Sequence, residues 1–137
     1  MDALKKSIKQ HEGYVNQVYK DSLGKRTVGY GHLCVESFWE DNIKYDQPYL
    51  DTIFEEDFDN ACRVAKKLIG DISLKQNAEG VIIEMCFQLG YRVTKFKKMW
   101  EALKKEDYVT ASKEMLDSNW HKQTGPRCEA LARKMCQ

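Results

Sequence analysis

The sequence predicts a single α+β domain, 1–137, that is mostly helical and has two lobes. Between residues 14 and 34, short β-prone pieces alternate with turn residues, which favours a small antiparallel sheet of two or three strands. Elsewhere apolar residues recur every three or four positions, the period of amphipathic helices. A chain of 137 residues, 42% of them hydrophobic, can bury a real core. We therefore expect a small N-terminal lobe with a short sheet, a long connecting helix and a helical C-terminal lobe.

The first element expected is an amphipathic helix over residues 2–12, with Asp2 as its N-cap and Gly13 as its stop. We group this helix with the C-terminal lobe, which otherwise covers about 75–137. The N-terminal lobe is expected over about 12–52, and it contains the predicted sheet.

Helical spacing returns after the sheet. The connecting helix is expected over about 52–69, and it ends at Gly70; its apolar residues are Ile53, Phe54, Phe58, Ala61, Cys62, Ala65, Leu68 and Ile69. A segment from about Ala78 to Leu89 is apolar nearly all round, as expected of a central buried helix. Three more helices are marked by Phe96, Met99, Trp100 and Leu103, by Ala111, Met115 and Leu116, and, after Gly125-Pro126, by Leu131, Ala132 and Met135.

The net charge is only +1, which argues against nucleic acid as a partner, because phosphate binding depends on a surplus of Lys and Arg. The charge is unevenly spread along the chain. Residues 36–59 contain nine acids and one lysine, whereas residues 91–137 contain eleven bases and six acids. Such runs are typical of solvated helix faces; the alternative is that the basic half attracts an anionic polymer.

No secretory signal follows Met1, and no apolar run reaches the length that spans a membrane. The five cysteines are odd in number and include no C-x-x-C pair, which is a poor match to a disulfide framework or a zinc site. We expect free, mostly buried thiols in a reducing cytosol; the cysteines are Cys34, Cys62, Cys86, Cys128 and Cys136.

Glu12, Asp21 and Thr27 form the candidate catalytic set. Cleavage of a glycosidic bond needs an acid and a base on opposite sides of the bond, and two carboxylates with a hydroxyl can supply them. Glu12 ends the first predicted helix, where the helix field favours the protonated form that a general acid needs. Each residue also has a simpler interpretation: Glu12 as a surface side chain, Asp21 as the start of a type I turn, and Thr27 as an ordinary strand residue.

The segment Gly29-Tyr30-Gly31-His32 needs an explanation, because glycines weaken a strand. Either a bulge or the close approach of a ligand to the backbone would account for them. His32 could be a catalytic base, a metal ligand or part of a structural ion pair. We favour the ion pair, since no second ligand stands at metal spacing.

Three ordered motifs resemble the phage-type lysozymes of glycoside hydrolase family 24, especially those of T-even phages. The first runs from Glu12 to Leu33 and keeps the spacing Glu-x8-Asp-x5-Thr. The second is Met85-Cys86-Phe87-Gln88-Leu89-Gly90, and the third is Ser118-Asn119-Trp120-His121-Lys122-Gln123-Thr124-Gly125-Pro126-Arg127. Together they are spread over residues 12–127, which is most of the length of the chain.

The resemblance implies a lysozyme-like fold and a muramidase activity without metal or organic cofactor. The bond cleaved would be the β-1,4 bond between N-acetylmuramic acid and N-acetylglucosamine, with inversion. Glu12 would protonate the leaving oxygen, Asp21 would stabilise positive charge on the sugar and orient a water, and Thr27 would hold that water. For an inverting enzyme the two carboxyl groups would stand about 6.5–9.5 Å apart.

The resemblance also assigns supporting residues. Those that would line the cleft are Leu33 and Phe87, and those that would lie beneath it are Gln88, Trp120 and Arg127. Arg127 would lie near Glu12 and favour its ionised form, against the helix field, and the sequence does not decide which effect is larger.

His32 would pair with Asp57 in a structural salt bridge. Three positions depart from the T-even pattern: Met99 and Glu114 replace small polar residues at the substrate, and Glu84 is an acid in the central helix that needs a partner if buried.

We expect bacterial peptidoglycan as the partner, no nucleic acid, no stable membrane insertion, and a monomer. Synthesis would occur in the host bacterial cytoplasm, with action on the wall after release by a separate membrane-permeabilising partner. Two alternatives remain: a lysozyme-like wall-binding protein that has lost turnover, motivated by the altered cleft positions, and a basic helical nucleic-acid binder built on the C-terminal half.

Overall fold

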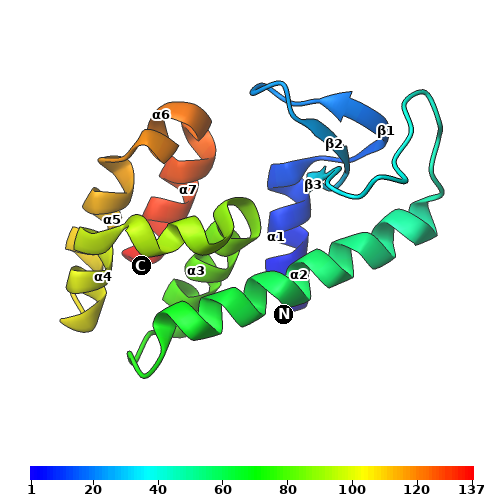
Figure 1. Cartoon of the computed structure of the whole chain (residues 1–137). Helices are drawn as coiled ribbons and strands as arrows, with labels where there is room; N and C mark the ends of the chain where they lie inside the picture. The colour runs from blue at the N-terminus through cyan, green and yellow to red at the C-terminus, as the bar shows by residue number, and fades with distance from the viewer. The chain divides into compact units, whose positions relative to one another are not determined.

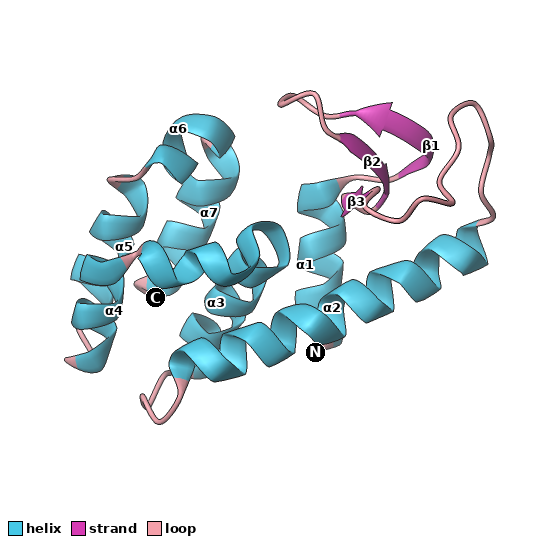
Figure 2. Cartoon of the chain, in the orientation of Figure 1, coloured by secondary structure: helices cyan, strands magenta, loops and turns pink.

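The computed structural model describes all 137 residues and contains seven α-helices, one short 3-10 helix (η1) and one three-stranded sheet (Figures 1 and 2). In chain order the elements are α1 Asp2–Glu12, β1 Val15–Lys20, β2 Arg26–Gly29, β3 His32–Leu33, α2 Gln47–Ile69, α3 Gln76–Leu89, η1 Gly90–Lys95, α4 Lys97–Lys104, α5 Tyr108–Leu116, α6 Asn119–Thr124 and α7 Pro126–Met135. This architecture confirms the mostly helical α+β fold with a small antiparallel sheet near the N-terminus.

The contacts divide the chain into two compact units, Met1–Asn60 and Ala61–Gln137. The first unit contains α1, the sheet and the N-terminal part of α2, and the second contains the rest of α2 and all later helices. The contacts therefore group α1 with the sheet. The lobe boundaries expected near residues 12, 52 and 75 stay a prediction.

α1 ends where the sequence predicts, but its N-cap is a different residue. Gly13 has a φ of 73°, in the left-handed region that suits glycine, and its N–H donates to the Lys9 carbonyl at 2.9 Å. At the other end Met1 is the N-cap, and no side chain caps the helix. The expected cap, Asp2, lies in the first turn instead, where its carboxylate still faces the positive end of the helix dipole.

The sheet is antiparallel with strand order β1-β2-β3, as the turn residues between the strands predict. Tyr19 pairs with Thr27 across β1 and β2, and Thr27 pairs with Leu33 across β2 and β3. The register is irregular between Val15 and Tyr19 on β1, so the sheet does contain a bulge or a similar distortion.

The core of the first unit lies beside the sheet. Val28, Trp39 and Leu50 are buried together, and the partly buried side chains packed against them are Val18, Cys34, Tyr45 and Ile53. Trp39 comes from the long loop between β3 and α2, drawn in pink in Figure 2. An ion pair of 2.7 Å between Lys5 Nζ and Glu55 Oε2 joins α1 to α2.

α2 begins at Gln47 rather than at about 52. Pro48 lies in its first turn, where a missing N–H costs nothing and the fixed φ of proline suits a helix. The C-terminal end agrees with the sequence: the helix stops at Ile69, and the Gly70 N–H donates to the Lys66 carbonyl at 3.0 Å.

In the second unit α3 is the central buried helix that its composition predicts, with Ala78 and residues 81–86 all buried. It contacts η1 and α7; α7 also contacts α5 and α6, and α4 contacts α5. The sequence does not predict η1 and α6, because six residues are too few to show a helical period. A signal for α6 does exist: Ser118 is its N-cap, and Ser118 Oγ accepts from the His121 N–H at 3.2 Å.

No disulfide joins any of the five cysteines, as expected, but the expectation that most are buried is wrong: only Cys86 and Cys128 are buried, and Cys136 is exposed. Burial raises the pKa of the Cys86 thiol to about 12 and that of Cys128 to about 11. Thiols that stay protonated are poor nucleophiles, so these two side chains belong to the core. No helix has both the length and the apolar character needed to cross a membrane.

Candidate active site

Glu12 is the last residue of α1, and its half-buried carboxylate lies against the backbone of Gly31, between β2 and β3. A side chain at residue 31 would overlap Glu12 Oε1, and its Cβ would lie only 2.9 Å from Glu12 Cδ. Gly31 also has a φ of 74°. Residue 31 must therefore be glycine, because the Glu12 carboxylate lies too close to its backbone to leave room for a side chain.

Asp21 begins the turn between β1 and β2. Its Oδ1 accepts from the backbone N–H groups of Leu23 and Lys25, both at 2.9 Å, and its carbonyl accepts from the Gly24 N–H at 2.9 Å. The turn interpretation is thus correct, and it is compatible with a catalytic role. Because the turn holds Oδ1, the carboxylate has a fixed orientation and Oδ2 remains available to another group.

Thr27 lies on β2 and is only 3% exposed. Its hydroxyl donates to the Lys25 carbonyl at 3.0 Å, and the Asp21 N–H donates to the same oxygen at 2.9 Å. One carbonyl therefore links Asp21 and Thr27. Because the hydroxyl hydrogen is used in the hydrogen bond to the Lys25 carbonyl, Thr27 Oγ1 can take part in a further hydrogen bond only as an acceptor, for example from a water.

Tyr19 of β1 is the register partner of Thr27. Burial raises the pKa of its phenol, and the negative charges of Glu12 and then Asp21 raise it further. The sequence contains the signal for Tyr19, because a three-residue loop with glycine at its left-handed third position closes on Asp21 and Lys25 and so puts residue 19 opposite residue 27.

His32 lies between two carboxylates. Its Nδ1 is 2.8 Å from Asp57 Oδ2, and its Nε2 is 2.9 Å from Glu36 Oε1, which also accepts from Trp39 Nε1 at 2.7 Å. The hydrogen bond to Asp57 raises the pKa of His32 to about 9, against the effect of burial, and Glu36 adds to the rise. The pKa of Glu36 is lowered, first by His32 and then by Trp39.

Both ring nitrogens of His32 are therefore engaged, which fits the ion-pair interpretation and leaves neither nitrogen for a metal or for proton transfer. The structure brings His32 and Asp57 together. Glu36 and Trp39 are partners that the sequence analysis does not name, although Glu36 stands only four residues after His32.

The other expected residues are placed as follows. Leu33 is on β3 and 44% exposed, and Phe87 is half-buried on α3. Gln88 and Trp120 lie in the second unit, where Trp120 Nε1 donates to Gln88 Oε1 at 2.9 Å. Arg127 is on α7 of the same unit, so its approach to Glu12, like the cleft itself, stays a prediction.

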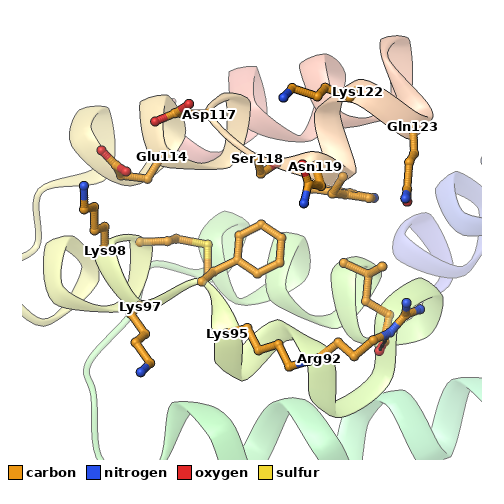
Figure 3. A pocket seen from close by; sticks show the side chains of 14 residues that line it. Arg92, Lys95, Lys97, Lys98, Glu114, Asp117, Ser118, Asn119, Lys122 and Gln123 are labelled. Atoms are coloured by element: carbon orange, nitrogen blue, oxygen red, sulfur yellow. Dashed lines mark hydrogen bonds between the residues drawn. The ribbon is translucent and has the colours of Figure 1, made fainter.

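Two of the departures from the T-even pattern, Met99 and Glu114, line one cavity of about 740 Å3 within the second unit (Figure 3). The third departure, Glu84, is completely buried on α3.

Residues 9–135 match the phage lysozyme family. The chain belongs to this family. Two relatives show how far the similarity extends. The probable T4-type lysozyme 1 of Dictyostelium discoideum is 26% identical over 93% of this chain and 89% of its own length. The peptidoglycan hydrolase gp36 of Pseudomonas phage phiKMV is 27% identical over 96% of this chain, but the match covers only 15% of that protein.

Membership of the phage lysozyme family supports a peptidoglycan-degrading glycoside hydrolase. The family match does not specify which bond is cut or with which stereochemistry. The stereochemistry depends on how the acid and the base are placed around the bond.

Proposed function

We propose that this protein is a muramidase that hydrolyses the β-1,4 bond between N-acetylmuramic acid and N-acetylglucosamine, with inversion. The observation that carries the proposal is the Lys25 carbonyl, which accepts from both the Asp21 N–H and the Thr27 hydroxyl, in a chain of the phage lysozyme family. An inverting hydrolysis requires a carboxylic acid and a carboxylate on opposite sides of the bond, and a hydroxyl can help to hold the attacking water.

Glu12 acts as the general acid. It ends α1, and its half-buried carboxyl group lies against the backbone of Gly31. From there it transfers a proton to the leaving glycosidic oxygen.

Asp21 and Thr27 act on the water. Thr27 Oγ1 accepts one proton of the water as a hydrogen bond, because its own proton is directed to the Lys25 carbonyl. Asp21 Oδ2 accepts the other and removes it as the water attacks the anomeric carbon, while the charge of Asp21 stabilises the oxocarbenium-like transition state. A single attack from the face opposite the leaving group inverts the anomeric configuration.

The test is clearing of purified cell walls, with the released reducing ends identified and the anomer followed by NMR. Glu12→Gln is expected to lower the clearing rate at least about 100-fold, because it removes the acid but keeps the shape. The matched control is Glu56→Gln, an exposed residue on α2 that should clear walls at the wild-type rate. Wild-type activity in Glu12→Gln would exclude Glu12 as the acid.

The second candidate is a wall-binding protein without turnover, favoured by Met99 and Glu114 in the cavity of the second unit. Sedimentation with walls, without clearing by the wild type, would support it. We also propose that the protein acts as a monomer and reaches the wall after synthesis inside a bacterial cell, through a release step made by another protein.

A further inference from the structure

Tyr30 lies between two glycines where the chain passes from β2 to β3, and both glycines have a left-handed backbone. Gly29 has a φ of 64° and Gly31 has a φ of 74°. Glycine has the widest conformational freedom of any residue, so these two residues do not by themselves fix the backbone. The contacts of the Tyr30 side chain therefore help to determine where the Gly31 backbone lies.

The ring of Tyr30 packs on α2. It meets the ring of Phe54 edge to face, with the two centroids 5.4 Å apart. Phe54 is only 2% exposed, and its ring also stacks on that of Phe58, with centroids 6.2 Å apart. Edge-to-face ring pairs are favourable beyond the area that they bury. Tyr30 is thus held by a buried part of the first unit.

The same ring contacts two residues that flank Glu12 in the sequence. Lys9, three residues before Glu12, has its Nζ 4.9 Å from the Tyr30 centroid and 4.8 Å from the Phe54 centroid. Tyr14, two residues after Glu12, has its ring centroid 4.9 Å from that of Tyr30. The chain is therefore attached to one ring on both sides of the proposed acid.

Lys9 is also the residue on which the last turn of α1 closes, because its carbonyl accepts from the Gly13 N–H at 2.9 Å. A cation over an aromatic face is attracted by the electrons of the ring. Tyr30 thus contacts the last turn of α1, which carries Glu12, and is bonded to Gly31, against which the Glu12 carboxylate lies.

We propose that Tyr30 is a positioning residue for the general acid: its ring, packed on Phe54, holds the end of α1 so that the Glu12 carboxylate stays against Gly31. The inference rests on the proposed function for the role of Glu12. Tyr30 itself transfers no proton. It acts through its ring, by way of Lys9 and Tyr14.

Three variants of the full-length protein test the proposal. Tyr30→Leu removes the ring but keeps an apolar side chain, and Tyr30→Phe keeps the ring. The matched control is Tyr45→Leu, in the loop before α2. Tyr45 is also half-buried in the first unit, and its ring also has a partner at 4.9 Å, but that partner is Trp39.

The first measurement is hydrogen exchange at the Gly13 amide, followed by NMR. This amide reports opening of the last turn of α1, since it is bound to the Lys9 carbonyl. Exchange is expected to be about tenfold faster in Tyr30→Leu, the combined size of one aromatic pair and one cation–π contact. Tyr30→Phe and Tyr45→Leu should exchange at the wild-type rate. An unchanged rate in Tyr30→Leu, or the same increase in Tyr45→Leu, would refute the proposal.

The second measurement determines kcat and KM on soluble, uncross-linked peptidoglycan strands, from the reducing ends released, at a temperature where circular dichroism shows every variant to be folded. A displacement of about 1 Å in a reacting group costs about 100-fold in rate. Tyr30→Leu is therefore expected to lower kcat about 10- to 100-fold with KM unchanged, the pattern of an interaction needed only in the transition state.

The variants that keep the ring of Tyr30 should keep the rate. Tyr30→Phe is expected to retain most of kcat, and Tyr45→Leu to retain all of it. A loss of kcat shared by Tyr45→Leu would mean that the ring only supports the fold. A higher KM with unchanged kcat in Tyr30→Leu would mean that the ring binds substrate. Either result would contradict a positioning role.

The two measurements separate this inference from the proposed function. If the wild type releases no reducing ends, the proposed function fails, and exchange at Gly13 alone decides whether Tyr30 holds the end of α1. If the wild type is active and Tyr30→Leu opens the last turn without a loss of kcat, the ring holds the helix but does not place the acid. In that case only this inference fails.

Discussion

Replacing Gly31 by Ala tests whether the backbone between β2 and β3 sets the position of the Glu12 carboxylate. The new Cβ would lie 2.9 Å from Glu12 Cδ, whereas carbon atoms in contact are normally about 3.5–4.0 Å apart. The carboxyl group must therefore move by roughly 1 Å, and a displacement of that size in a reacting group costs about 100-fold in rate. A second cost comes from the φ of 74°, which disfavours any residue with a Cβ by about 1–2 kcal/mol.

The two costs can be separated with Gly70→Ala as the control. Gly70 directly follows α2 and has a φ of 56°, and a Cβ there meets nothing within 4 Å. Both variants should lose about 1–2 kcal/mol of unfolding free energy in urea titrations, but only Gly31→Ala should lose about 100-fold in wall clearing. If Gly31→Ala clears walls as fast as Gly70→Ala, the carboxylate position does not depend on this close approach and the reasoning is wrong.

Two further predictions concern the sheet. His32 has a pKa of about 9 when folded and about 6.5 when unfolded, so its ion pairs stabilise the protein fully below about pH 6.5 and are lost as the pH rises to 9. His32→Asn should therefore cost about 1–3 kcal/mol in urea unfolding at pH 6 and little at pH 9.5; an equal loss at both would contradict this assignment. Thr27→Val should cost about 1 kcal/mol of stability, because the Lys25 carbonyl keeps the Asp21 N–H, but about 100-fold in wall clearing. Thr27→Ser should retain most of the activity, and an active Thr27→Val would show that the hydroxyl does not hold the water.

The parts of the fold that the sequence predicts are those fixed by local patterns. Gly13 ends α1 and Gly70 follows the end of α2 as expected, and the apolar composition of α3 identifies it as the buried helix. The start of α2 escapes prediction because Gln47, Pro48 and Tyr49 show no apolar period. Propensity for the first turn of a helix, which favours proline, would have been the better guide there.

In the candidate site, too, local patterns predict some features, whereas others depend on tertiary packing. The spacing of Glu12, Asp21 and Thr27 is visible in the sequence, and the hairpin register that unites Thr27 with Tyr19 could be derived from the turn. The roles of Glu36 and Trp39 could not be derived, because they lie in an irregular loop whose path depends on tertiary packing.

The loop between β3 and α2 is connected to the candidate site through the backbone of Gly31 and His32. His32 follows Gly31 directly, and its ring is held by Asp57 of α2 and by Glu36 of the loop, whose oxygen also binds Trp39 in the core beside the sheet. The start of β3 is therefore anchored to both the helix and the core. Because Gly31 supports the Glu12 carboxylate from the preceding position, the same ion pairs that stabilise the first unit also keep fixed the surface against which Glu12 rests. The stability of the first unit and the position of the Glu12 carboxylate thus depend on two adjacent residues. His32 contributes its charge, and Gly31 leaves room because it has no side chain.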